Sequence, residues 1–218
     1  MLPTLAVIDI DILSGQDELA REGLLENLGR FKDSFITPLW VNWLRERADL
    51  RVVCLVQDLA RLDDFLIDAV RTVPGVRGTA AQLAFSGVVR SDPLMDVAFF
   101  NTVWDQRAAA TVQVKTQPGQ DRAVYRALIE LPRHEQVAIV WVVKLFHSTE
   151  ADLQLLLLGD RTAALTGYAM SWVRTVPCVM DTQLSSVLDW RILGQTEDFI
   201  ALAQRFPEPT ITPKRAQP

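Results

Sequence analysis

The chain has 218 residues, 49% hydrophobic and 22% charged, and its 10 glycines and 11 prolines exclude low-complexity and collagen-like architectures. Its net charge of −5 at pH 7 argues against direct nucleic-acid binding by the chain as a whole, while a local basic patch stays open. Two cysteines without metal-site spacing exclude a disulfide-stapled domain and a zinc site, and favour a reducing compartment.

The N-terminal segment is apolar, but it lacks the basic residues of a signal peptide and carries Asp9 and Asp11. The longest uncharged apolar run, residues 137–143, has seven residues, whereas a membrane span needs roughly 18–20. We therefore expect a soluble, cytoplasmic protein with no membrane partner.

Residues 8–12 alternate in hydrophobicity with the period of a strand, and a Gly-Gln-Asp helix start follows at residues 15–17. This alternation places Asp9 and Asp11 on one face of the strand. Two carboxylates on one face could form an acid/base pair, but a solvated edge face is the favoured interpretation.

The next elements form a predicted hairpin, a helix and a final strand. Two apolar runs, 36–44 and 50–56, read as the hairpin, and residues 62–73 carry apolar side chains at helical spacing. A strand near residues 79–89 follows, and Asp92 before a proline predicts the start of a trailing helix.

The same pattern then recurs. Residues 70–76 (VRTVPGV) return as residues 173–179 (VRTVPCV), with six of seven positions identical at an offset of 103. The Ala-Asp-Leu motif that ends at Leu50 also returns at this offset, and the Gly-Gln-Asp motif returns at an offset of 104. An internal repeat held in register over this distance predicts two copies of one structural unit.

Each copy reads β-α-β-β-α-β, the ferredoxin-like arrangement, so the fold class is α+β. The predicted domains are a first module over residues 1–105, a second over 106–206 and a mobile tail over 207–218. Each four-stranded sheet leaves one face bare, and residues 137–143 are apolar on both faces. We therefore expect the two modules to pack sheet to sheet as a pseudo-dimeric α/β barrel.

The Ala-Asp-Leu hairpin end, the helix ending in Val-Arg-Thr-Val-Pro and the strand that follows resemble the effector-binding (RAM) domain of the Lrp/AsnC family of regulators. The resemblance covers both copies, in tandem and without the family's helix-turn-helix. It implies a domain that pairs into barrels, assembles further and binds amino acids.

The resemblance implies ligand-binding roles for four residues, Asp49, Asp152, Arg71 and Arg174. The two aspartates would accept hydrogen bonds from the ammonium group of an amino acid, and the arginines would receive its carboxylate. The alternatives are that each aspartate favours a turn and that each arginine offsets a helix dipole at its C-terminus.

The remaining residues predict no catalytic centre. The only histidines, His134 and His147, cannot build a His-rich metal site, so no metal is expected. No Gly-rich nucleotide loop, nucleophile elbow or Cys-x-x-Cys motif occurs, so no cofactor is expected. The sheet tryptophans Trp40, Trp43 and Trp141 either fill the barrel or line a ligand cavity.

The main prediction is a non-catalytic sensor of an amino-acid-like effector that forms homo-oligomers and acts on a DNA-binding relative by hetero-assembly. A second hypothesis is a cofactor-independent enzyme, such as an oxygenase or isomerase, because dimeric α/β barrels also host enzymes and fold does not fix function. A third is an assembly module without a ligand. A pocket between sheet and helices that holds a His, Tyr or carboxylate would favour the enzyme.

Overall fold

The structure is a computed structural model that describes residues 3–31, 33–45, 49–98, 107–132, 134–146, 148 and 150–208. The predicted module boundary at residues 105 and 106, His147 and the tail beyond residue 208 lie outside the described residues.

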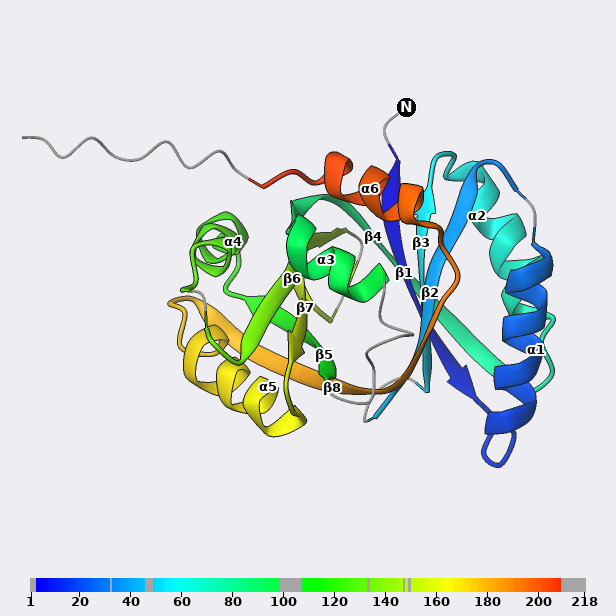
Figure 1. Ribbon diagram of the computed structural model, residues 1–218, viewed down its shortest axis with the longest axis horizontal. Coiled ribbons are helices and arrows are strands. Elements are labelled where there is room, and N and C mark those ends of the chain that lie inside the picture. The colour runs from blue at the N-terminus through cyan, green and yellow to red at the C-terminus, as the bar shows by residue number, and fades with distance from the viewer. Residues whose placement is uncertain are drawn as a thin grey trace, which may run out of the picture.

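The first copy of the repeat forms the ferredoxin-like order predicted for it (Figure 1). Its elements are β1 (Thr4–Ile12), α1 (Asp17–Arg30), β2 (Ile36–Leu44), β3 (Leu50–Val56), α2 (Ala60–Phe65), the π-helical turn η1 (Leu66–Arg71), β4 (Val76–Val89) and the trailing helix α3 (Ser91–Ala98).

The second copy repeats this order. Its elements are β5 (Ala108–Thr116), α4 (Asp121–Ile129), β6 (Val137–Phe146), β7 (Leu153–Gly159), α5 (Thr162–Tyr168), the π-helical turn η4 (Ala169–Val173), β8 (Val179–Ile192) and α6 (Thr196–Arg205).

The eight strands of the described residues join in one closed antiparallel barrel with the order β1-β3-β2-β8-β5-β7-β6-β4. The two copies are hydrogen-bonded to each other twice, through β2 with β8 and through β4 with β6. The predicted pseudo-dimeric α/β barrel is therefore confirmed, with continuous pairing at both junctions between the sheets.

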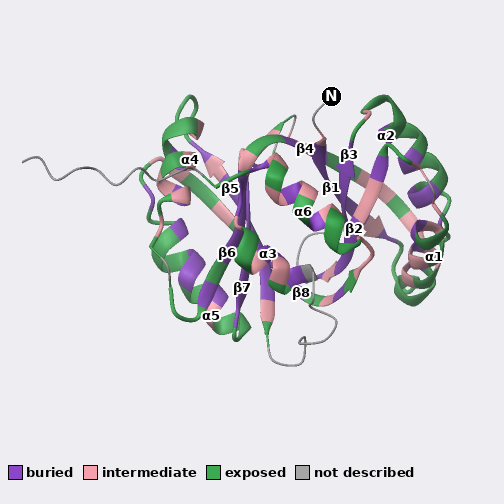
Figure 2. Ribbon diagram, turned by 45° about the horizontal axis from the view of Figure 1, so that its top comes forward, coloured by how far each residue is buried: buried purple, intermediate pink, exposed green. Residues whose placement is uncertain are grey.

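Helices cover the outside of the barrel on two opposite flanks (Figure 1). In the first copy α1, α2 and η1 bury an apolar stripe against the sheet that includes Leu24, Phe65 and Val70. The equivalent helices of the second copy bury Leu128, Tyr168 and Val173. Figure 2 shows the resulting pattern, in which the strands are mostly buried and the helices expose their outer faces.

The predicted helix before each Val-Arg-Thr-Val-Pro motif changes from α to π geometry midway, at Leu66 in one copy and at Ala169 in the other. Each helix is followed by a left-handed residue, Gly75 with φ of 87° and Cys178 with φ of 68°. Cys178 adopts this conformation although it is costly for a residue with a Cβ atom.

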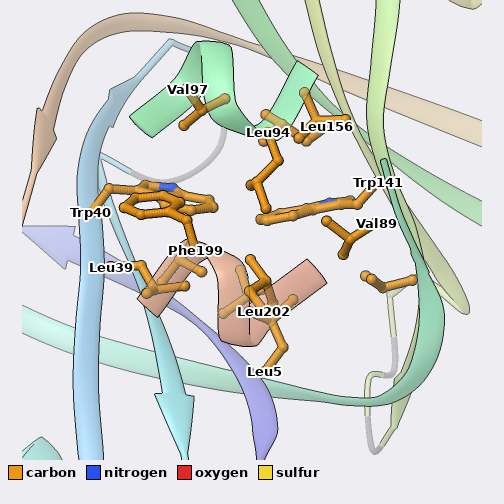
Figure 3. Packing of buried hydrophobic residues seen from close by; sticks show 14 of the residues in the cluster. Leu5, Leu39, Trp40, Val89, Leu94, Val97, Trp141, Leu156, Phe199 and Leu202 are labelled. Carbon is orange, nitrogen blue, oxygen red and sulfur yellow. The ribbon is translucent and has the colours of Figure 1, made fainter. Parts of the chain in front are cut away.

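The helices α3 and α6 close one end of the barrel with apolar side chains (Figure 3). Trp40 lies at the centre of this layer and stacks on Trp141, with ring centroids 5.2 Å apart, and on Phe199 at 5.9 Å. Trp43 points the other way, toward the outer face, where Arg21 lies 4.6 Å from its ring centroid. The tryptophans Trp40 and Trp141 therefore fill this part of the barrel.

The other half of the barrel interior holds a layer of polar side chains. Arg51 is only 1% exposed, and its Nε donates to Asp9 at 2.6 Å while its Nη1 donates to Thr111 of the second copy at 2.7 Å. The solvated edge face predicted for Asp9 is therefore wrong, because barrel closure turns that face of β1 inward. Asp11 lies farther along the strand, half exposed and 3.5 Å from Arg77.

Among the described helices, none is both long and apolar enough to span a bilayer. Both cysteines are unpaired, and complete burial strongly raises the pKa of the Cys54 thiol, which keeps it protonated.

Candidate active site at the rim of the barrel

A pocket of about 170 Å³ lies where the end of β4, the start of β6 and helix α5 meet. We call it the rim pocket, and its lining residues are Arg90, Asp92, Pro93, Pro132, His134, Val137, Ala138, Ile139, Tyr168 and Glu208. Its volume is close to that of cavities that hold a single benzene ring.

Tyr168 ends α5 and is only 3% exposed. Burial raises the pKa of its phenol, and the guanidinium of Arg90 offsets part of this rise. The phenol oxygen lies 3.5 Å from the carbonyl oxygen of Pro132, which makes a weak hydrogen bond. At neutral pH the phenol therefore carries its proton and can donate it to a ligand oxygen.

His134 precedes β6 and packs edge-on against the Tyr168 ring at 5.7 Å between centroids. The backbone N–H of Gln136 donates to His134 Nδ1 at 3.1 Å. In the neutral imidazole this bond leaves the proton on Nε2. His134 is therefore a hydrogen-bond donor at the mouth of the pocket.

Arg90 follows β4, and its backbone N–H donates to the Val140 carbonyl at 2.8 Å, which fixes it to β6. Its Nη2 also donates to the carbonyl of Ile129 at 3.1 Å. The guanidinium is permanently charged, and its remaining N–H groups can bind a carboxylate or an enolate oxygen.

The rest of the rim pocket divides into two parts. The apolar side chains of Val137 and Ile139 form a buried wall, while Asp92 and Glu208 are exposed carboxylates at the opening. A cation and two further hydrogen-bond donors beside an apolar wall suit an organic ligand on which negative charge develops. The carboxylates are candidate proton acceptors.

A second, more open pocket of about 330 Å³ shares His134 and Tyr168 with the rim pocket and adds Arg161, Ser171 and Trp172. Trp172 is partly exposed, and its ring stacks with Tyr168 at 6.5 Å between centroids. The rim pocket therefore continues outward onto an aromatic surface.

The predicted ligand-binding aspartates make equivalent contacts in the two copies. The Asp49 carboxylate accepts from the backbone N–H of Ile12 at 2.6 Å, and that of Asp152 accepts from Thr116 at 2.8 Å. Asp152 also pairs with Lys115 at 3.3 Å. Each aspartate thus ties a hairpin to the end of the first strand of its copy.

The predicted arginines lie at the ends of the π-helical turns, where both are exposed. Arg71 donates to Thr79 at 2.9 Å, and Arg174 contacts the Met170 sulfur at 3.8 Å. Within the described part of the chain neither arginine is bonded to Asp49 or Asp152. The ligand-binding roles of these four residues stay predictions.

The sequence patterns do not point to Arg90 or Tyr168, but a comparison of the two copies identifies both residues. Tyr168 occupies the position of the core residue Phe65, at the offset of 103. Arg90 occupies the position of Leu193, and the backbone N–H groups of both donate to equivalent carbonyls, those of Val140 and Leu39. Apolar positions of one copy have thus become polar in the other.

No three His, Cys, Asp or Glu side chains of the described residues are grouped so that they could hold a metal ion. The groups that line the rim pocket are proton donors, proton acceptors and a cation.

No family model matches the chain, and no curated protein matches it either. Solved structures do match. An anthrone oxidase-like protein superposes with a TM-score of 0.55 at 11% identity over 88% of this chain and 94% of its own. A chlorite dismutase variant from Candidatus Nitrospira defluvii gives 0.54 at 12% identity, over 86% and 91%. A siroheme decarboxylase gives 0.55 at 10% identity, over 92% and 77%.

These structures share the fold of this chain, and each is described as an enzyme or as enzyme-like. This comparison contradicts the predicted non-catalytic effector sensor, because the solved structures that share the fold are enzymes or enzyme-like proteins. The resemblance to the Lrp/AsnC family, the homo-oligomer and the DNA-binding relative stay predictions.

Proposed function

We propose that this protein is a cofactor-independent enzyme of the dimeric α/β-barrel type that removes a proton from carbon in a small cyclic substrate. The observation that carries the proposal is the convergence of Arg90, His134 and Tyr168 beside the apolar wall of the rim pocket.

The proposed reaction begins when a carboxylate of the pocket mouth, Glu208 or Asp92, takes a proton from a carbon that is adjacent to a carbonyl group or conjugated with it through a ring. The electron pair of the broken C–H bond moves to the substrate oxygen. Arg90 and the protonated phenol of Tyr168 stabilise the resulting enolate, and His134 Nε2–H adds a third donor. In an isomerase the proton returns at another carbon. In an oxygenase the enolate carbon transfers an electron to dioxygen, the resulting radical and superoxide combine in a C–O bond, and the peroxide anion takes up the proton as a hydroperoxide.

The dimensions of the site support a planar substrate. One ring fills a pocket of about 170 Å³, and further rings would lie against Trp172 in the adjoining open pocket. The two unpaired cysteines support a cytoplasmic setting for this enzyme.

The proposal is tested by proton exchange in deuterated water, followed by NMR, with cyclohexanone as a one-ring substrate and anthrone as a three-ring substrate. Oxygen uptake is measured with anthrone. We expect the protein to accelerate exchange of at least one substrate. We expect Tyr168→Phe and Arg90→Gln each to lower that rate by roughly 10²-fold, the usual loss for one transition-state donor.

Tyr125→Phe, at the other tyrosine of the sequence, and Arg61→Gln are the matched controls, because neither residue lines the rim pocket. Tyr168→Phe should fold, since the first copy carries Phe65 at the equivalent position. Equal exchange rates for the protein, Tyr168→Phe and Arg90→Gln with both substrates would refute the proposed function.

A further inference from the structure

Another hollow, separate from the rim pocket and from the open pocket beside it, lies between helix α4 and strands β4 and β6. It has a volume of about 370 Å³, and we call it the anion groove, lined by Gly87, Val88, Arg122, Tyr125, Arg126, Ile129, Lys144 and Pro207. The lining residues of the anion groove and of the rim pocket do not overlap.

Helix α4 turns one face toward the anion groove, because Arg122, Tyr125, Arg126 and Ile129 follow each other at helical spacing. Arg122 and Arg126 are exposed, and neither forms an ion pair with another residue in the part of the chain that the structure describes. Like charges four residues apart destabilise a helix slightly, so packing alone does not explain this pair.

Lys144 of β6 is the third cation, and its charge is already balanced. Its Nζ lies 3.0 Å from Asp121 and 5.2 Å from the centroid of the Tyr125 ring. The hydrogen bond from Lys144 lowers the pKa of Asp121, and burial raises the pKa of the Tyr125 phenol. The groove therefore holds a net positive charge from Arg122 and Arg126, together with a protonated phenol.

A comparison with the first copy of the repeat shows that the positive charge of the anion groove is specific to the second copy. Helix α1 carries Glu18 and Glu22 at the positions of Arg122 and Arg126, at the offset of 104. Both copies have a cation–π contact between the opening helix and the strand that follows it. In the first copy helix α1 supplies the cation, because Arg21 lies over Trp43 of β2. In the second copy strand β6 supplies it, because Lys144 lies over Tyr125 of α4. The packing is therefore shared by the two copies, whereas the pair of exposed arginines is not.

We propose that the anion groove binds a small organic phosphate, with its phosphate group between Arg122 and Arg126 and its apolar part against Ile129, Val88 and Pro207. Two guanidinium groups one helical turn apart match the several acceptor oxygens of a phosphate monoester. On a chain of net charge −5 this local excess of positive charge draws an anion to one place.

The test is calorimetric titration of the full chain at low salt with phenyl phosphate, with inorganic phosphate and phenol as reference ligands. We expect saturable binding of phenyl phosphate that weakens as salt rises. Inorganic phosphate should bind about tenfold more weakly than phenyl phosphate, because it lacks the apolar ring. Phenol should not bind measurably, because it lacks the phosphate group. Equal affinities for inorganic phosphate and phenyl phosphate would overturn the role of Ile129, Val88 and Pro207 in binding.

The variant Arg122→Glu/Arg126→Glu copies the residues of the first copy, so it should fold, and we expect its affinity for phenyl phosphate to fall at least about tenfold. Arg122→Gln/Arg126→Gln should lose a similar factor. Adding Glu18→Arg/Glu22→Arg to the first variant restores the net charge of −5 and should not restore binding. Unchanged affinity in Arg122→Glu/Arg126→Glu, or no binding by the unmodified chain, would overturn the proposal.

Discussion

Arg51 places a full positive charge inside the barrel, within the layer of polar side chains that fills one half of the interior. The cost of removing this charge from water is offset by Asp9 at 2.6 Å and by the hydroxyl of Thr111 at 2.7 Å. Its Nη2 and the side-chain amides of Asn42 and Gln154 are buried without a hydrogen-bond partner among the described residues. Arg51 and Asp9 therefore stabilise each other inside the barrel.

We predict that Arg51→Met destabilises the protein by about 3–5 kcal/mol, because it leaves the Asp9 carboxylate buried without its partner. The double variant Arg51→Met/Asp9→Leu should be close to the unmodified protein, since it removes both charges. Urea denaturation followed by circular dichroism measures both values. The single variant Asp9→Leu completes the comparison. If the double variant lost as much unfolding free energy as Arg51→Met and Asp9→Leu lose together, the two residues would not be coupled.

The surroundings of single residues were the least predictable from the sequence. Alternation along β1 correctly placed Asp9 and Asp11 on one face, but it could not reveal that this face points into a closed barrel toward Arg51. The sequence excludes His134 as part of a His-rich metal site and does not single out Tyr168, for a similar reason. Their chemistry depends on Arg90, which is distant in sequence and reaches the pocket only because β4 pairs with β6.

The helix ends show how equivalent elements satisfy one backbone requirement with different residues. The turn after η1 uses Gly75, and the turn after η4 uses Cys178, both with positive φ. A Cβ atom added to Gly75 would lie 2.8 Å from the Cβ of Gln16, closer than unstrained atoms approach.

We predict that Gly75→Ala destabilises the protein by roughly 2–3 kcal/mol, from the left-handed conformation and from the crowding against Gln16. Gly119→Ala is the control, because Gly119 also has positive φ but a Cβ atom added there would meet no neighbouring group within 4 Å. That variant should lose only about 1 kcal/mol. Thermal unfolding compares the two, and equal losses would mean that crowding at Gly75 contributes nothing.

The elements themselves were largely predictable, because hydrophobic period and turn residues are local signals. Both hairpins, both opening helices and the strands after the Val-Arg-Thr-Val-Pro motif form where the sequence placed them. The change to π geometry at Leu66 and Ala169 was not predicted, because i, i+3, i+4 spacing reports a helix without specifying which backbone bonds close it.

At the scale of the whole molecule, the two copies share one interior, with an apolar layer at one end and a polar layer at the other. Trp40 of the first copy stacks on Trp141 of the second, and strand pairing crosses the boundary twice. The repeat in the sequence predicted this pairing of modules. It did not predict that α3 and α6 would close one end of the barrel, because their apolar faces do not specify which surface they cover.

We predict that the protein unfolds in a single cooperative transition. Tryptophan fluorescence reports chiefly on the shared interior, whereas circular dichroism reports on both copies, and the two urea curves should coincide because neither copy can open without exposing the other. Two separated transitions would show that one copy keeps its structure without its neighbour.

The stacking of Trp40 on Trp141 relates the two halves as the partners of a twofold axis would be related, yet around that axis the halves have diverged in their chemistry. Had two identical chains formed this barrel, every working group would occur twice. A single chain that carries both copies is free of that constraint. Tyr168 and Arg90 accordingly line the rim pocket on one side, while Phe65 and Leu193 occupy the equivalent positions on the other. The proposed function therefore implies a stoichiometry of one active site for each polypeptide.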